Sequence, residues 1–406
     1  MVDFASRLVQ IPSVNPPGEH YVDCVELLAG TLEQMGFETE RYDATDRPEH
    51  TALHPRPNIV GTRSPTGKRP LVHLNGHFDV VPAGDGWTID PFAGEVRQGR
   101  LYGRGSADMK AGLACAIFAA DALRRADLEP LGTIQISGTV DEESGGLAGV
   151  AHLARSGVIS SEITDHVIIP EPLGVDRICV GHRGVYWFKL TTHGRIAHGS
   201  MPFLGVSAIT QMAAVLQRLT ATVAVDLADR RTQMPVVPEE ARRASININS
   251  IVGGQREDGL QTPCVADRCE AVIDRRFLVE EGLEQVKAEI GELLRHMEAE
   301  DPDLQCSMED MLVVQPTLTP SDDPLVHSLK RSIRSVVGTE AALIASPGTY
   351  DHKHVTQIAG VTSCVAYGPG VLEQAHQPDE WCSVDDMRSA AQVMALTLAD
   401  LCGCAK

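Results

Sequence analysis

The sequence has few aromatic side chains, few cations and no long apolar segment. Aromatic residues make up 4% of the 406 residues, and 35 lysines and arginines stand against 55 aspartates and glutamates, which leaves a formal net charge of −20. Because nucleic-acid binding requires clustered cations, and no such cluster occurs, we expect no nucleic-acid partner. No stretch approaches the roughly 20 apolar residues that span a bilayer, so we expect no membrane partner either.

Closely spaced cysteine pairs and a targeting segment are also missing. The ten cysteines are scattered, and only Cys402 and Cys404 lie close together, without the spacing of common metal sites. Scattered thiols of this kind are typical of a reducing compartment. The N-terminus has no basic segment followed by an apolar run, so we expect no signal peptide. The composition therefore indicates a globular, cytoplasmic protein.

The order of predicted strands and helices indicates an α/β domain in the first part of the chain. Up to about residue 183, short apolar strands alternate with amphipathic helices, which is typical of a mainly parallel sheet covered on both faces. The expected strands are 69–82, 131–140 and 165–170, and the expected helices are 21–35, 109–126 and 149–155.

A smaller α+β domain interrupts this pattern. From about residue 184 the order changes to strand, helix, strand, strand, helix and strand, which predicts a lid with an open-faced sheet. We therefore predict a catalytic domain formed by 1–183 and 314–406, with the lid at 184–313. The expected lid elements are strands at 185–192, 245–252, 268–277 and 304–313 and helices at 207–221 and 279–298, and the last segment adds strands at 343–346 and 362–367 and a helix at 384–401.

Polar motifs in the α/β part occur where predicted strands end, which is where open α/β sheets build their sites. In His77-Phe-Asp79 the two polar side chains share a face, so the carboxylate is placed to orient a metal-ligating imidazole. A histidine and an aspartate in a turn are the alternative. Asp108, in Gly-Arg-Gly-Ser-Ala-Asp, precedes a helix and is either a ligand or an N-cap. The glycines match no phosphate-binding motif.

Three successive carboxylates, Asp141-Glu142-Glu143, stand at the end of another strand. Clustered like charges are costly unless cations or shared protons compensate them. Because neighbouring residues of an extended chain point in opposite directions, one glutamate can bind a metal while the other faces a substrate. A solvated acidic turn is the alternative interpretation.

Two more candidate ligands follow apolar strands. Glu171 stands between two prolines, and His376 lies in a loop rich in glycine and proline. A surface turn and an ordinary loop histidine explain them equally well when each is taken alone. Together, however, these motifs supply two histidines and several carboxylates, a nitrogen and oxygen set that suits zinc, manganese or cobalt.

The order and spacing of these motifs over nearly the whole chain resemble a known family. His77-x-Asp79, GRGSAD at Asp108, DEESGG at Glu142 and Glu143, Glu171-Pro, and Gly-Pro followed by His376 are similar to the dinuclear zinc hydrolases. That family holds acetylornithine deacetylase, succinyl-diaminopimelate desuccinylase, aminoacylase and the bacterial glutamate carboxypeptidases. The resemblance implies a metallopeptidase-like catalytic domain interrupted by a lid that forms a homodimer.

The resemblance also implies a pair of divalent metal ions, with zinc expected and cobalt or manganese as alternatives. The implied ligands are His77 and Glu171 for one ion, Glu143 and His376 for the other, and Asp108 as the bridge. Glu142 is implied as the general base, and Asp79 as the partner of His77.

The lid and the last segment supply the implied substrate contacts. His198 is expected to reach the partner subunit's active site and stabilise the oxyanion. Arg276 is expected to hold a substrate carboxylate, together with the backbone of Gly348 and Thr349. The alternative for Arg276 is a strand-surface arginine paired with Asp274.

Two stretches depart from the family pattern. Residues 263–266 read Pro-Cys-Val-Ala where relatives often carry Asn-x-x-Pro, and Gly348-Thr is followed by Tyr350 before the aspartate. His352 and His354 in the second stretch are either substrate contacts or loop residues. Both departures concern substrate recognition, and they leave the implied metal ligands unchanged.

The resemblance predicts hydrolysis of the amide bond of a small N-acyl amino acid, by a hydroxide that bridges the two ions and with Glu142 as base. A dipeptidase, a carboxypeptidase, or hydrolysis of another C–N bond in a small carboxylate-bearing substrate is the alternative. A non-catalytic metal-binding scaffold is disfavoured, because all the implied ligands and the base are present. A dinucleotide-dependent dehydrogenase is disfavoured because its glycine fingerprint is missing.

Overall fold

A computed structural model describes residues 1–64, 69–254 and 263–405, and the chain divides into two compact units. Unit 1 consists of Met1–Gly181, Leu318–Ile344 and Tyr350–Lys406, and unit 2 of His182–Thr317 and Ala345–Thr349. The sequence contains no sign that the short segment Ala345–Thr349 joins unit 2.

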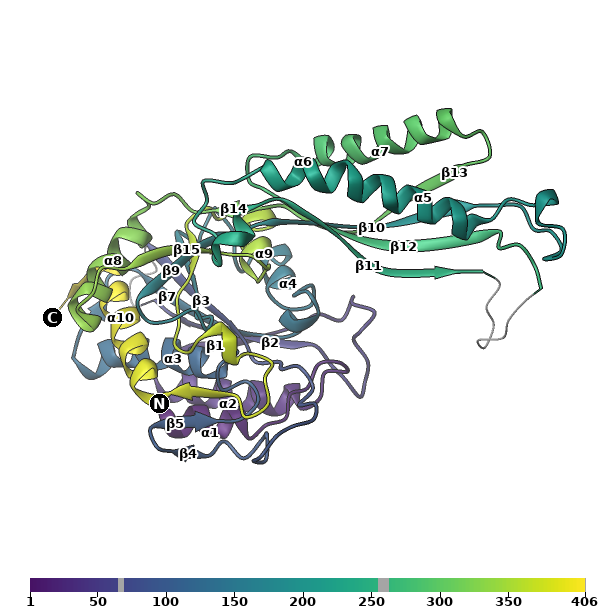
Figure 1. The fold of residues 1–406 in the computed structure, drawn as a ribbon. Helices are drawn as coiled ribbons and strands as arrows, with labels where there is room; N and C mark the ends of the chain where they lie inside the picture. The colour runs from purple at the N-terminus through teal and green to yellow at the C-terminus, as the bar shows by residue number, and fades with distance from the viewer. Residues whose placement is uncertain (65–68, 255–262, 406) are drawn as a thin grey trace. The chain divides into compact units, whose positions relative to one another are not determined.

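The main sheet has the strand order β1-β2-β7-β3-β8-β16-β9-β14, with β15 beside β9 (Figure 1). Its inner strands β7, β3, β8 and β16 run parallel, whereas β1, β2 and β9 pair antiparallel at the flanks. The predicted α/β class with a mainly parallel central sheet is therefore confirmed. The strands are β1 (Glu38–Asp43), β2 (Pro57–Arg63), β3 (Leu71–His77), β7 (Thr133–Thr139), β8 (His166–Ile169), β9 (Arg177–His182), β14 (Thr317–Leu318), β15 (Ala342–Ser346) and β16 (Cys364–Ala366).

The two faces of this sheet differ in polarity because side chains alternate along each strand. Val72 and Leu74 of β3 and Ile136 of β7 belong to the apolar core, which also holds the buried sides of α2, α3, α8 and α10. His73 and Asn75, the intervening residues of β3, point to the opposite face and are equally buried.

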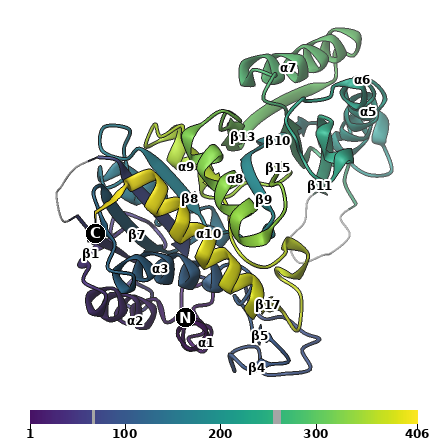
Figure 2. The same cartoon turned by 90° about the vertical axis from the view of Figure 1, so that its left-hand side faces the viewer.

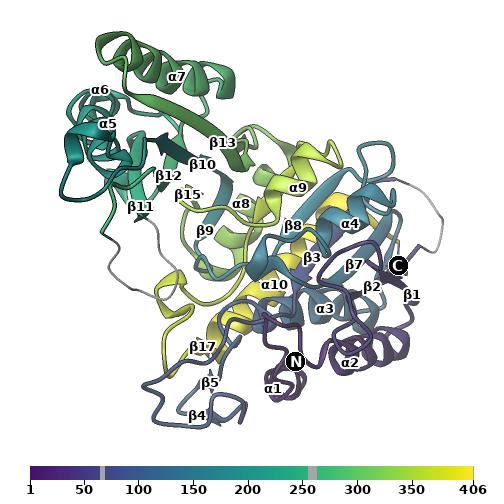
Figure 3. The same ribbon diagram turned by 90° about the vertical axis from the view of Figure 1, so that its right-hand side faces the viewer.

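Helices cover both faces of the sheet. In Figures 1 and 2, α3 and the long C-terminal α10 lie against one face, and Figures 1 and 3 show α4 and α9 on the other. The helices of unit 1 are α1 (Val2–Val9), α2 (Tyr21–Gln34), α3 (Lys110–Arg125), α4 (Val150–Arg155), α8 (Pro324–Val337), α9 (His352–Gln357) and α10 (Val384–Cys402), and its small strands are β4 (Val96–Arg97), β5 (Arg100–Tyr102), β6 (Glu129–Pro130), β17 (Trp381–Ser383) and β18 (Cys404–Ala405).

Unit 2 is built on an antiparallel sheet of order β11-β12-β10-β13. Alternate residues of β12 are buried, and the apolar ones among them pack with α5 and α7 in a second apolar core. Both helices lie on the same side of the sheet (Figure 1), and among the described residues of unit 2 no helix covers its other face. The elements are β10 (Gly184–His193), α5 (Ala208–Ala221), α6 (Val223–Asp229), β11 (Ser245–Gly253), β12 (Arg268–Phe277), α7 (Leu283–Glu300) and β13 (Gln305–Val314).

Within the part of the chain that the structure describes, one helical stretch, Ala208–Asp229, has the length and the apolar composition needed to cross a membrane. Its apolar residues Met212, Val215 and Leu219, however, are buried in the core of unit 2. The apolar composition of α5 is therefore explained by packing against the sheet.

Candidate metal centre

Five side chains of unit 1 form two groups, each of which brings its ligand atoms within 4.8 Å of one another. The first group contains His77, Asp108 and Glu171, and the second contains Asp108, Glu143 and His376. Asp108 belongs to both groups. The structure thus brings together all five predicted ligands, in the two sets that the resemblance implies.

The topology of the sheet explains this convergence. His77 is the last residue of β3, Glu171 follows β8, and the Asp141–Glu143 turn follows β7. These three strands are parallel neighbours, so their carboxyl ends meet at one edge. Asp108 comes from the loop before α3 and does not cap this helix, whose N-cap position is Met109. The N-cap alternative for Asp108 is therefore wrong.

The hydrogen bonds of His77 fix which nitrogen faces the other ligands. Its Nδ1 lies 3.0 Å from the carbonyl oxygen of Asp79, to which it donates, so Nε2 is free to act as a ligand atom. Nε2 lies 3.3 Å from Asp108 Oδ1. The Asp79 carboxylate is farther from Nδ1, at 3.5 Å.

Asp79 makes further contacts besides the one with His77 that the sequence predicts. Its carboxylate, which is fully buried, accepts hydrogen bonds from the backbone nitrogens of Glu142 and Glu143 at 3.1 and 3.2 Å. It also accepts one from the Asn15 side chain at 3.0 Å. Asp79 therefore holds the backbone of the turn that carries Glu142 and Glu143.

A buried ion pair that the sequence does not predict holds the Asp108 loop. Arg104 and Glu380 lie 2.6 Å apart, with side-chain exposures of 3% and 0%. The other carboxylate oxygen of Glu380 accepts from the backbone nitrogens of Ala107 and Asp108, at 2.8 and 3.1 Å. Glu380 thereby fixes the residue that the two groups share.

The charges of the site favour divalent cations. Burial, reinforced by the charge of Asp108, raises the pKa of Glu143 to about 7 and that of Glu171 well above its usual range. Closely placed, buried carboxylates need positive charge to stay ionised, and two divalent ions would supply it. Two imidazoles and three carboxylates are also a donor set that fits zinc, manganese or cobalt. The residues therefore fit the predicted pair of ions.

Glu142 lies beside the two groups and belongs to neither. Its side chain is 13% exposed, and its Oε1 lies 3.6 Å from the Nζ atom of Lys353. A carboxylate next to the candidate ions that is not itself a ligand is what a general base requires.

The remaining predicted residues lie in unit 2. His198 is exposed, and its Nδ1 accepts from the backbone nitrogen of Ser200 at 3.1 Å. Arg276, on β12, is paired with Asp274 at 2.8 Å, as the alternative interpretation predicts. Gly348 and Thr349 belong to the returning segment Ala345–Thr349 and are partly buried.

His352 and His354, for which the sequence leaves two roles open, lie in α9. His352 is fully buried, and its Nδ1 lies 3.2 Å from the hydroxyl of Tyr350. His354 donates from Nε2 to the carbonyl of Gly145 at 2.7 Å. Neither is a loop residue: α9 contains both, and His354 contacts the turn after Glu142 and Glu143.

The fold and this site define a metal-dependent hydrolase. Residues 73–400 match the model of Peptidase family M20/M25/M40, so the chain belongs to this family. Succinyl-diaminopimelate desuccinylase of Methylobacillus flagellatus is 30% identical over 98% of this chain and 98% of its own. The desuccinylase of Psychrobacter arcticus is 28% identical over 98% and 94%. The crystal structure of aminopeptidase PepT from Bacillus cereus has the same fold, with a TM-score of 0.76 at 23% identity over 98% of this chain and 97% of its own.

The Glu380 ion pair generates the first prediction. Glu380→Gln leaves the Arg104 cation buried without a counter-ion, which should lower the free energy of unfolding by about 3–5 kcal/mol. Urea denaturation of the metal-free protein measures this loss. The matched control Glu373→Gln, an exposed residue just before His376, should change it by about 0.5 kcal/mol or less. Equal stability of the two variants would contradict the role given to Glu380.

Proposed function

We propose that this protein hydrolyses the amide bond of a small N-acyl amino acid, with an N-succinylated amino acid as the favoured substrate. One observation carries the proposal: two ligand groups share Asp108, and the non-ligand carboxylate of Glu142 lies beside them. Full-length similarity to two desuccinylases supports the succinyl group.

The five grouped side chains would hold the metal ions. His77 and Glu171 would bind one ion, Glu143 and His376 the other, and Asp108 would bridge them. Zinc is the proposed metal, with cobalt or manganese as substitutes. When bound, such ions supply Lewis-acid activation of water and of the substrate carbonyl.

Glu142 is the proposed general base. Its carboxylate accepts the proton of the attacking water and returns it to the nitrogen of the leaving amine. Asp79 supports this role, because it holds the backbone nitrogens of Glu142 and Glu143.

His198 is the proposed donor to the oxyanion. Because Nδ1 accepts a hydrogen bond from the Ser200 backbone, the neutral imidazole carries its proton on Nε2. An exposed Nε2–H is a donor suited to a developing negative charge. Arg276, Gly348 and Thr349 are the proposed contacts of the substrate carboxylate, with Arg276 shared between the substrate and Asp274.

A homodimer through unit 2 and a cytoplasmic location complete the proposal. The edge strand β11 exposes Ile251 and Val252, and the 202–204 turn exposes Phe203, which supports an apolar contact between two copies. No disulfide joins the cysteines that the structure describes, which supports a reducing compartment.

Peptide cleavage is the second candidate, and the likeness of the fold to an aminopeptidase favours it. A single panel of N-succinyl amino acids, N-acetyl amino acids and dipeptides distinguishes the two, with both products identified by mass spectrometry. Faster turnover of dipeptides than of N-acyl amino acids would favour peptide cleavage and contradict the first proposal.

Removal of metal should abolish activity. A chelator should reduce turnover to background, and zinc, cobalt or manganese should restore it. Elemental analysis should find two ions per reconstituted wild-type chain. In His376→Ala it should find one ion per chain, because Asp108 and Glu143 alone bind the second ion poorly. The control His327→Ala, exposed on α8, should keep both. A reconstituted wild-type chain without bound ions would contradict the proposed centre.

Replacement of the base should separate catalysis from metal binding. Glu142→Ala should lower kcat by about 10²–10⁴-fold, since a positioned general base contributes that much. Its metal content should stay at the wild-type level. Glu162→Ala, at an exposed glutamate before β8, should change neither quantity. Wild-type kcat in Glu142→Ala would refute the assignment.

A further inference from the structure

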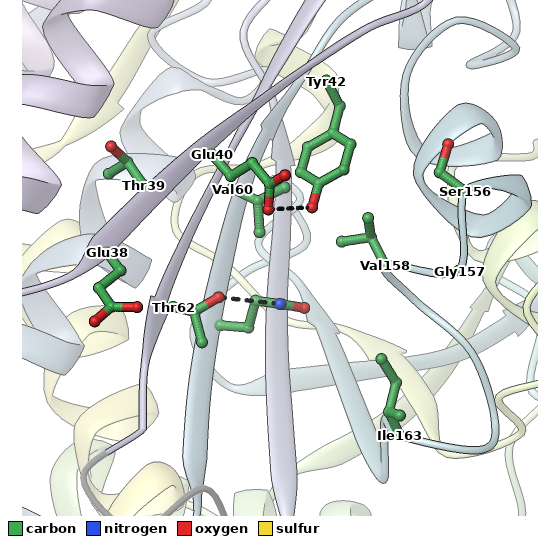
Figure 4. A pocket seen from close by; sticks show the side chains of 11 residues that line it. Glu38, Thr39, Glu40, Tyr42, Val60, Thr62, Ser156, Gly157, Val158 and Ile163 are labelled. Atoms are coloured by element: carbon green, nitrogen blue, oxygen red, sulfur yellow. Dashed lines mark hydrogen bonds between the residues drawn. The ribbon is translucent and has the colours of Figure 1, made fainter.

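A row of buried polar side chains links β3 and β7 to the first turn of α9. Its members are Gln135, His73, Ser137, Asn75 and Asp351, whose polar atoms lie 2.7, 2.7, 2.7 and 2.9 Å apart in that order. At the outer end, Gln135 donates to Thr62 in a hollow of about 500 Å³ that both residues line (Figure 4). Burial lowers the pKa of His73, in the middle of the row, to about 4.

The inner end of this row anchors α9 to the sheet. Asp351 is buried and accepts from Asn75 through Oδ2. Its Oδ1 lies so near Gly146 that a Cβ atom there would come within 2.6 Å of it. His354 bonds the carbonyl of Gly145. The first turn of α9 therefore packs directly on the turn that carries Glu142 and Glu143.

Lys353 projects from this anchored turn to Glu142. Its Nζ lies 3.6 Å from Glu142 Oε1, and the two side chains are only 7% and 13% exposed. Among the described residues, no other cationic side chain lies within 4.0 Å of the Glu142 carboxylate. A lysine immobilised in this way loses rotamer freedom and hydration, and the ion pair with Glu142 is what offsets the cost.

Glu142 needs such a partner. A glutamate side chain has three rotatable bonds, and a misplacement of about 1 Å in a catalytic group can cost about 10²-fold in rate. Asp79 fixes the backbone of Glu142 but does not bond its carboxylate. Among the described residues, Lys353 forms the one ion pair that the Glu142 carboxylate makes.

We propose that Lys353 is a positioning residue for the general base: its ammonium, carried by the anchored turn of α9, holds the Glu142 carboxylate in the direction from which it transfers the proton. This role rests on the proposed function of Glu142. It differs from a substrate contact, because the Lys353 side chain is largely buried and its Nζ atom lies beside the base.

Steady-state kinetics of the metal-reconstituted full chain on an N-succinyl amino acid test the catalytic part. Lys353→Met should lower kcat by about 10²-fold, with KM within about threefold of the wild type and metal content unchanged. Lys353→Arg should recover at least roughly a tenth of the wild-type kcat, because it keeps the charge. The control Lys330→Met, on α8, should match the wild type. An unchanged kcat, or a raised KM at constant kcat, would overturn the proposal.

A double-mutant comparison tests the contact without any turnover. Lys353→Met should shift the midpoint of urea denaturation of the metal-free chain. In a Glu142→Gln background, this shift should be less than half as large as in the wild-type background. Lys330→Met should give equal changes in both backgrounds. Equal midpoint shifts by Lys353→Met in the wild-type and Glu142→Gln backgrounds would overturn the proposal. If wild-type protein hydrolyses no acyl amino acid, the proposed function fails, and this second result still decides whether Lys353 pairs with Glu142. If Lys353→Met does not fold, Lys353→Gln takes its place in both experiments.

Discussion

The structure depends on one electrostatic constraint: several carboxylates are buried together at one edge of a sheet. Asp79, Asp108, Glu143 and Glu171 are all largely out of water, and few cations in the described part of the chain lie near them. Such a cluster is stable only where each carboxylate is hydrogen-bonded, paired or bound to a metal. The surrounding chain supplies the first two kinds of support, and the proposed ions supply the third.

Two successive sets of residues support the ligand groups. Asp79 binds backbone nitrogens of the Glu142–Glu143 turn, and Glu380 binds that of Asp108. Outside them, Arg104 neutralises Glu380, and the polar face of β3 and β7 anchors α9 against the same turn. Asp79, Arg104 and Glu380 lie in loops close to the ends of β3, β5 and β17, and the polar residues of β3 and β7 lie on the sheet itself. Supports of this kind suit a catalyst that must place water, carbonyl and base together.

Much of this arrangement follows from local sequence patterns. The apolar runs before His77 and Glu171 predict β3 and β8, so the convergence of ligands at one sheet edge was predictable. The residues that hold the ligands in place could not be predicted in the same way. Arg104 and Glu380 are 276 residues apart, and Asn75 and Asp351 are equally distant. No local pattern marks such pairs, and α9, which carries Lys353, is not among the helices that the sequence predicts.

The most direct test of the account is the location of the ions themselves. Anomalous diffraction at the zinc absorption edge, from crystals of the zinc-reconstituted protein, should show two peaks, with a carboxylate oxygen of Asp108 next to each. His77 and Glu171 should contact one peak, and Glu143 and His376 the other. A single peak, or no peak between these side chains, would contradict the account.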